Sequence, residues 1–244
     1  AVNAKRAGSS GVGPARLARV QDRMVELEVD ALLLSLGPEM PWLTGYTPMP
    51  LERLTMLVLG PEGPGQLYIP RLEAPRVIER DDVFSVRPWE EAEDPVALVA
   101  DQLRAQQART GRRNARVAVG DRTWARFVFE LRDQLPAEMT LERAHPVTGP
   151  LRACKEPAEI DALRRAAAAA DSVAAQLQNR EIPLVGRTEA DIAADISRRL
   201  VEAGHQHTNF AIVATAENAA SPHHEPTDRI VRFGDVLLCD FGGT

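Results

Sequence analysis

Short apolar segments alternate with amphipathic segments over the first 134 residues, and this alternation restricts the fold more than any other feature. In the first amphipathic segment, apolar residues recur at three- and four-residue steps, which is typical of a helix with one buried face. The apolar segments are three to six residues long and are bounded by Gly and Pro, as buried strands are. The predicted helices are 14–28, 95–107 and 123–134, and the predicted strands are 31–34, 54–59, 66–69 and 117–119. We therefore expect an α/β domain with a parallel or mixed sheet.

The pattern of predicted elements changes after residues 145–150, where we place a domain boundary. An Ala-rich helix is predicted over 156–178, with Pro157 tolerated in its first turn. A second helix is predicted over 188–202, because Thr188 is a good N-cap and acidic residues follow it. Strands are predicted at 210–214, 230–231 and 236–239. The predicted domains are 14–148 and 149–244, preceded by a flexible tail over 1–13.

The composition is that of an ordinary globular protein, with 44% hydrophobic and 26% charged residues. The net charge of −6 gives no support for nucleic-acid or acidic-membrane partners. No apolar run approaches the eighteen residues of a membrane span, and the polar start of the chain does not resemble a secretory signal. Cys154 and Cys239 lie far apart and have no metal-ligand spacing. We expect free thiols and a cytoplasmic location.

The last eleven residues place a carboxylate directly after an apolar run. The run 236–239 is typical of a strand covered on both faces, and Asp240 follows it. A buried carboxylate in such a place needs hydrogen bonds, an ion pair or a cation. Asp before Gly-Gly is also a common turn signal, so a turn at Asp240 is the alternative. Because a central strand is a poor place for a free chain end, we expect a longer parent protein.

Two pairs of histidines lie in the last forty residues of the chain, 205–244. His223 and His224 follow Pro222, which stiffens their approach, and in a strand their side chains would point to opposite faces. We therefore expect at most one of the two to be functional. His205 and His207 come after a predicted helix end, where histidines are usually solvated or bonded to backbone carbonyls.

The order of these motifs resembles a family of metallopeptidases. The family contains Xaa-Pro aminopeptidases, prolidases, methionine aminopeptidases and creatinase, which share the pita-bread fold. The matching catalytic-domain segments are 151–160, 186–189, 218–223, 228–229 and 234–243, and segments 16–17, 30–34 and 42–46 resemble the creatinase-type N-terminal domain. The resemblance implies a creatinase-like N-terminal α/β domain followed by the first half of a pita-bread α+β catalytic domain.

The resemblance also implies a site and a reaction. In this family two divalent metal ions, Mn, Co or Zn, are held by two aspartates, one histidine and two glutamates. Asp240 matches the first metal ligand. His223, seventeen positions earlier, matches the histidine that donates a hydrogen bond to the substrate or to the developing oxyanion. The other ligands would lie after Thr244, so we expect this chain alone to be inactive and metal-free.

The creatinase-like N-terminal domain narrows the implied function. Methionine aminopeptidases typically lack this domain, so we expect a homodimeric exopeptidase that cleaves Xaa-Pro bonds in proline-containing peptides, either a dipeptidase or an aminopeptidase. Three alternatives stay open. One is a non-catalytic pita-bread module that binds a peptide or protein, and the second is a creatinase-type amidinohydrolase. The third is an unrelated α/β protein with Asp240 in a turn.

Overall fold

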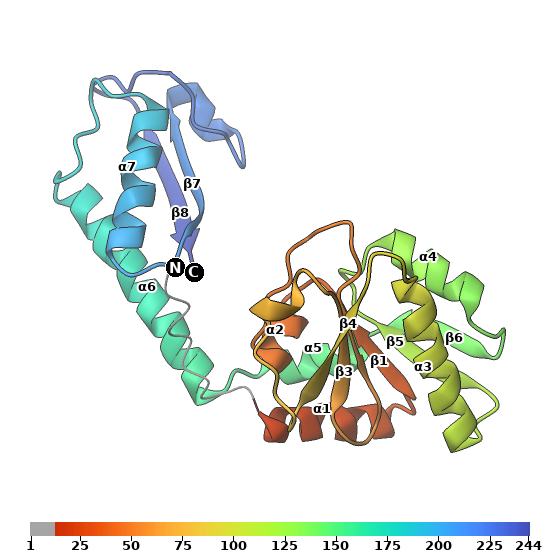
Figure 1. Cartoon of the computed structure of the whole chain (residues 1–244). Coiled ribbons are helices and arrows are strands. Elements are labelled where there is room, and N and C mark those ends of the chain that lie inside the picture. The colour runs from red at the N-terminus through yellow and green to blue at the C-terminus, as the bar shows by residue number, and fades with distance from the viewer. Residues whose placement is uncertain (1–12) are drawn as a thin grey trace. The chain divides into compact units, whose positions relative to one another are not determined.

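The computed structural model describes residues 13–244, which divide into two compact units (Figure 1). The first unit ends at Lys155, and the second comprises Glu156–Thr244. Except for Gly13, the tail predicted over 1–13 lies outside the described residues. The segment at which we placed a domain boundary, 145–150, belongs to a helix of the first unit.

The first unit is built on a six-stranded mixed sheet with the order β4-β3-β2-β1-β5-β6. Its strands are β1 (Ala31–Leu34), β2 (Met56–Leu59), β3 (Gly65–Pro70), β4 (Phe84–Trp89), β5 (Ala115–Val119) and β6 (Met139–Arg143). Strands β1, β5 and β6 are parallel, as are β3 and β4, while β2 is antiparallel to both of its neighbours. The predicted α/β class with a mixed sheet is confirmed.

Helices cover both faces of this sheet (Figure 1). On one side lie α1 (Pro14–Glu26), α2 (Glu39–Thr44) and α5 (His145–Ala153), and on the other lie α3 (Pro95–Thr110) and α4 (Ala125–Gln134). Strand β1 shows why its sequence is apolar throughout. Leu32 and Leu34 pack into one core cluster and Ala31 and Leu33 into the other, because successive side chains of a strand point to opposite faces.

Truncation of Leu33 to alanine tests this two-sided burial. Leu33 is fully buried in a strand of the central sheet, so Leu33→Ala should lower the free energy of unfolding of the first unit by about 2–5 kcal/mol. Leu72 is 68% exposed, and Leu72→Ala should change this free energy by less than about 0.5 kcal/mol. Urea unfolding of both variants measures the difference. Equal effects would contradict the packing described here.

The second unit packs two helices on a two-stranded sheet. Its elements are α6 (Pro157–Gln178), α7 (Glu189–Glu202), β7 (Thr208–Thr215), the 3₁₀ turn η2 (Ala216–Ala220) and β8 (Leu237–Gly243). The predicted helix starts are confirmed. Glu156 caps α6, with Pro157 in its first turn, and the Thr188 hydroxyl caps α7 by accepting a hydrogen bond from the Asp191 amide at 3.0 Å. Val173, Ile196 and Val213 lie in the shared core.

Strand β8 differs from its prediction in length and in burial. It runs through Asp240 to Gly243, antiparallel to β7, so the alternative of a turn at Asp240 is wrong. The sequence predicts cover on both faces of this strand, and within residues 13–244 only one face is covered. Leu237, Cys239 and Phe241 pack on the core, whereas Leu238, which points to the other face, is 42% exposed. An apolar run predicts a strand, but it does not distinguish one covered face from two.

Other local differences have simple causes. The strand predicted at 230–231 is absent, and Ile230 forms only an isolated bridge to Thr188 because two apolar residues are too few for a strand. Strands β4 and β6 and helices α2 and α5 were not predicted, since their sequences interrupt the apolar residues with polar ones or proline. None of the helices within residues 13–244 is long and apolar enough to cross a lipid bilayer.

Candidate active site

The second unit contains a pocket that is lined by both residues singled out in the sequence. The pocket has a volume of about 460 Å³ and lies where the loop before β8 meets strands β7 and β8. Its lining residues are Phe210, Ala211, Ile212, His223, His224, Glu225, Pro226 and Asp240. Two carboxylates and two imidazoles therefore meet an apolar wall in one pocket, an arrangement suited to a small polar ligand with an apolar side chain.

Asp240 reaches this pocket because of its register in the sheet. It pairs with Ile212 of β7, and the alternation along β8 turns its side chain away from Cys239 and Phe241, which face the core. The Asp240 side chain is exposed. The expectation that this carboxylate is buried is therefore wrong for the described chain, because helices cover the opposite face of the sheet.

His223 and His224 both line the pocket, because they lie in a loop and not in a strand. His223 has φ +56°, in the left-handed region that non-glycine residues rarely adopt, and its side chain is exposed. The His224 ring is committed to another contact, since its Nε2 lies 2.9 Å from Oε2 of Glu189. The strand-based reason for expecting only one functional histidine does not hold, but the two rings differ in their surroundings.

Glu189, the first residue of α7, is a buried carboxylate, whereas the sequence predicts only an acidic residue in the first turn of a helix. It accepts hydrogen bonds from the Thr215 amide at 2.7 Å, from Asn218 Nδ2 at 3.0 Å, and from both the amide and the hydroxyl of Thr227 at 3.0 and 2.7 Å. Burial would raise the pKa of the Glu189 carboxyl. The hydrogen bonds, led by that from His224, outweigh burial and lower the pKa to about 2.

Comparison with known proteins decides the family. Residues 16–154, more than half of the chain, match the creatinase/prolidase N-terminal domain. The chain belongs to this family. Residues 161–244 match metallopeptidase family M24. The resemblance predicted from the motifs is thus confirmed for both parts of the chain.

The relatives that this chain matches are peptidases by name. It is 36% identical over 232 residues to a probable dipeptidase PepE of Mycobacterium tuberculosis, covering 94% of this chain and 59% of that protein. It is 29% identical to an Xaa-Pro dipeptidase of Lactobacillus helveticus, covering 93% of this chain and 61% of the relative. A crystal structure of prolidase from Thermococcus sibiricus superposes with a TM-score of 0.82 at 28% identity, covering 93% of this chain and 60% of that one. The chain therefore spans about three fifths of the length of these relatives.

The metallopeptidase match implies divalent metal ions, so the donors present were compared with such a centre. Asp240 supplies oxygen atoms at the pocket, which is the donor type that hard divalent ions take. Within residues 13–244, however, no three His, Cys, Asp or Glu side chains gather closely enough to hold an ion. The residues present do not by themselves fit a two-metal centre.

The other histidines serve different contacts. His205 is buried, and its Nε2 lies 3.0 Å from the carbonyl oxygen of Ala166, as expected for a histidine bonded to the backbone. His207 is exposed, and its Nε2 lies 3.0 Å from the Thr244 hydroxyl. Neither residue lines the pocket of His223 and Asp240.

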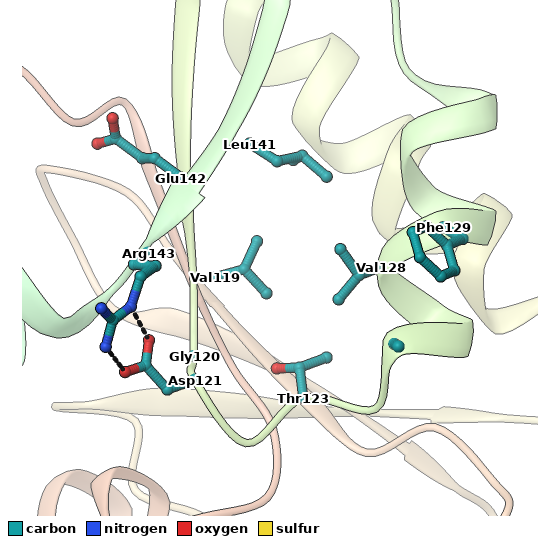
Figure 2. A pocket seen from close by; sticks show the side chains of 10 residues that line it. Val119, Gly120, Asp121, Thr123, Val128, Phe129, Leu141, Glu142 and Arg143 are labelled. Carbon is teal, nitrogen blue, oxygen red and sulfur yellow. Dashed lines mark hydrogen bonds and ion pairs between the residues drawn. The ribbon is translucent and has the colours of Figure 1, made fainter.

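The first unit has a pocket of about 560 Å³ between α4 and the edge strand β6 (Figure 2). Its walls are mainly apolar, with Val119, Val128 and Leu141 pointing into it. At its side, Arg143 and Asp121 form an ion pair with 2.5 Å between Nη2 and Oδ2. The second acidic residue of the lining, Glu142, is paired with Arg116 at 2.8 Å. Because ion pairs engage both acidic groups and most of the wall is apolar, this pocket offers less chemistry than the pocket of His223 and Asp240.

The low pKa of Glu189 makes the stability of the second unit depend on acid. Because the folded-state pKa of about 2 lies below the ordinary 4.5, ionised Glu189 stabilises the fold fully above pH 4.5. This contribution, about 3 kcal/mol from the size of the shift, should be lost as the pH falls from 4.5 toward 2. Urea unfolding at several pH values measures it, and Glu189→Gln should remove that part of the pH dependence. An identical acid dependence in the variant would refute the assignment.

Proposed function

We propose that the full-length protein, of which this chain would be a part, is a metal-dependent exopeptidase. It would cleave Xaa-Pro bonds, as an Xaa-Pro dipeptidase or aminopeptidase. The observation that carries the proposal is that His223 and Asp240 line one pocket in a chain whose second part matches metallopeptidase family M24. The names of the relatives, dipeptidase and Xaa-Pro dipeptidase, support the substrate class.

Each residue has a role in this proposal. His223 lies exposed in the pocket, where its ring can donate a hydrogen bond to the carbonyl oxygen of the scissile peptide and stabilise the charge that develops there. Asp240 would supply one oxygen ligand to a divalent-metal centre, whose other ligands would come from outside residues 13–244. Divalent cations in such a centre would polarise the peptide carbonyl and activate water. Phe210 and Ile212 give the pocket an apolar wall against which a substrate side chain can pack.

The test is hydrolysis by the full-length protein with added Mn²⁺, Co²⁺ or Zn²⁺. We expect free proline from Xaa-Pro dipeptides, or a free N-terminal residue from Xaa-Pro-Yaa tripeptides, detected by chromatography. Matched Xaa-Ala peptides serve as controls and should be cleaved more slowly. Absence of cleavage with all three metals would refute the proposal. Creatine turnover would favour a creatinase-type amidinohydrolase, and peptide binding without cleavage a non-catalytic module.

The proposal extends to assembly and location. We propose a homodimer, on the basis of the creatinase-like N-terminal domain, and light scattering of the full-length protein tests it. We also propose a cytoplasmic protein, in keeping with two free thiols, Cys154 exposed and Cys239 partly buried. Activity measured with each metal in turn will rank Mn, Co and Zn.

A further inference from the structure

The contacts of Glu189 converge on one stretch of chain, residues 215–227. Thr215 ends β7, Asn218 lies in η2, and His224 and Thr227 follow in the loop. These residues lie 26 to 38 positions after Glu189 in the sequence, yet all of them donate to its two carboxylate oxygens. One fully buried side chain at the start of α7 therefore anchors the segment on both sides of His223.

The backbone of this segment needs such an anchor. Ala216 and His223 have φ values of +48° and +56°, which cost free energy for residues with a side chain and persist where the surroundings hold them. Thr215 and Asn218 are held next to the first of these positions, and His224 and Thr227 next to the second. Loss of the Glu189 carboxylate would leave these donors without their acceptor and release both turns.

The carboxylate also distinguishes the two histidines. A carboxylate ionised at neutral pH only accepts hydrogen bonds, so Nε2 of His224 carries the proton that it shares with Glu189. The His224 ring is thereby fixed. The neighbouring His223 side chain makes no hydrogen bond within residues 13–244 and remains available at the pocket.

We propose that Glu189 is a positioning residue of the candidate active site, which fixes the 215–227 segment and thereby sets the place of His223 opposite Asp240. This inference rests on the proposed peptidase function. It assigns Glu189 no contact with the substrate or with metal. Its effect on turnover passes through the geometry of His223.

The test compares variants of the full-length protein. In Glu189→Gln, an NH₂ group replaces one acceptor oxygen and lies against the hydrogen-bond donors of His224 and Thr227, so these donors lose their acceptor. We therefore expect kcat to fall about 10- to 100-fold with little change in KM. Glu189→Asp retains the charge and should recover part of the loss. Asp195→Asn is the matched control. Asp195 lies on the same helix and pairs with Arg187, Arg198 and Arg199, none of them in the 215–227 segment, so kcat should stay as in the wild type.

A second readout does not depend on turnover. In the protein with ¹⁵N-labelled histidine, NMR should show a protected Nε2 proton on His224, and Glu189→Gln should remove it and shift the His223 ring resonances. Asp195→Asn should change neither. If Glu189→Gln does not fold, Thr227→Val removes one donor with little change in shape and should shift the His223 resonances in the same direction.

The outcomes separate the two claims. Wild-type protein that cleaves no peptide would refute the proposed function and leave the NMR comparison to decide on Glu189. An active wild type with unchanged kcat in Glu189→Gln, or His223 resonances identical in wild type and variant, would overturn the positioning role.

Discussion

Asp240→Asn should reduce peptide cleavage by the full-length protein by more than about 100-fold. Removal of a group that only hydrogen-bonds to a metal ligand already costs about 10- to 100-fold, and Asp240 is proposed as a direct ligand. The amide that replaces the carboxylate has no negative charge to hold a divalent cation. Bound metal, measured by mass spectrometry after dialysis, should fall together with activity. In this chain alone, without bound metal, stability should change by less than about 0.5 kcal/mol, since the Asp240 side chain is exposed there.

The matched control for Asp240 is Asp171→Asn. Asp171 is an exposed carboxylate on α6 outside the pocket, and its removal should leave both metal content and turnover unchanged. Full activity of Asp240→Asn would contradict the proposed ligand role. Loss of activity with full metal content would instead move Asp240 to a role in substrate binding.

His223→Asn should lower kcat by about 100- to 1000-fold, the range found when one donor to a developing oxyanion is removed. Asparagine tolerates the left-handed conformation better than most residues, so the turn at φ +56° should survive. Metal content should be unaffected, which separates this variant from Asp240→Asn. Steady-state kinetics with an Xaa-Pro dipeptide is the measurement.

The control for His223 is His207→Asn, which removes an exposed histidine outside the pocket. Its kcat should equal that of the wild type. If both variants lose activity equally, a general loss of structure explains the result better than a lost hydrogen bond. If neither variant loses activity, His223 has no catalytic role.

Elements with strong local signals were predictable from the sequence. Strand β1 was located to the residue, because four consecutive apolar residues followed by Ser-Leu-Gly leave few other conformations. The start of α7 was predictable because the Thr188 cap and the acidic first turn act within one turn of the helix. Strands β4 and β6 were not predicted, because they are held in the sheet by pairing with β3 and β5 and their own composition gives no clear strand pattern.

By itself the sequence determined the family, the alternation of strands and helices, and the two residues, His223 and Asp240, proposed for the site. The tertiary structure decided what surrounds them. Pairing of β7 with β8 turned Asp240 to the uncovered face of the sheet, and folding brought Glu189 to donors 26 to 38 residues away. Such contacts leave no local pattern, because a buried carboxylate at a helix start has the same neighbours in sequence as an exposed one.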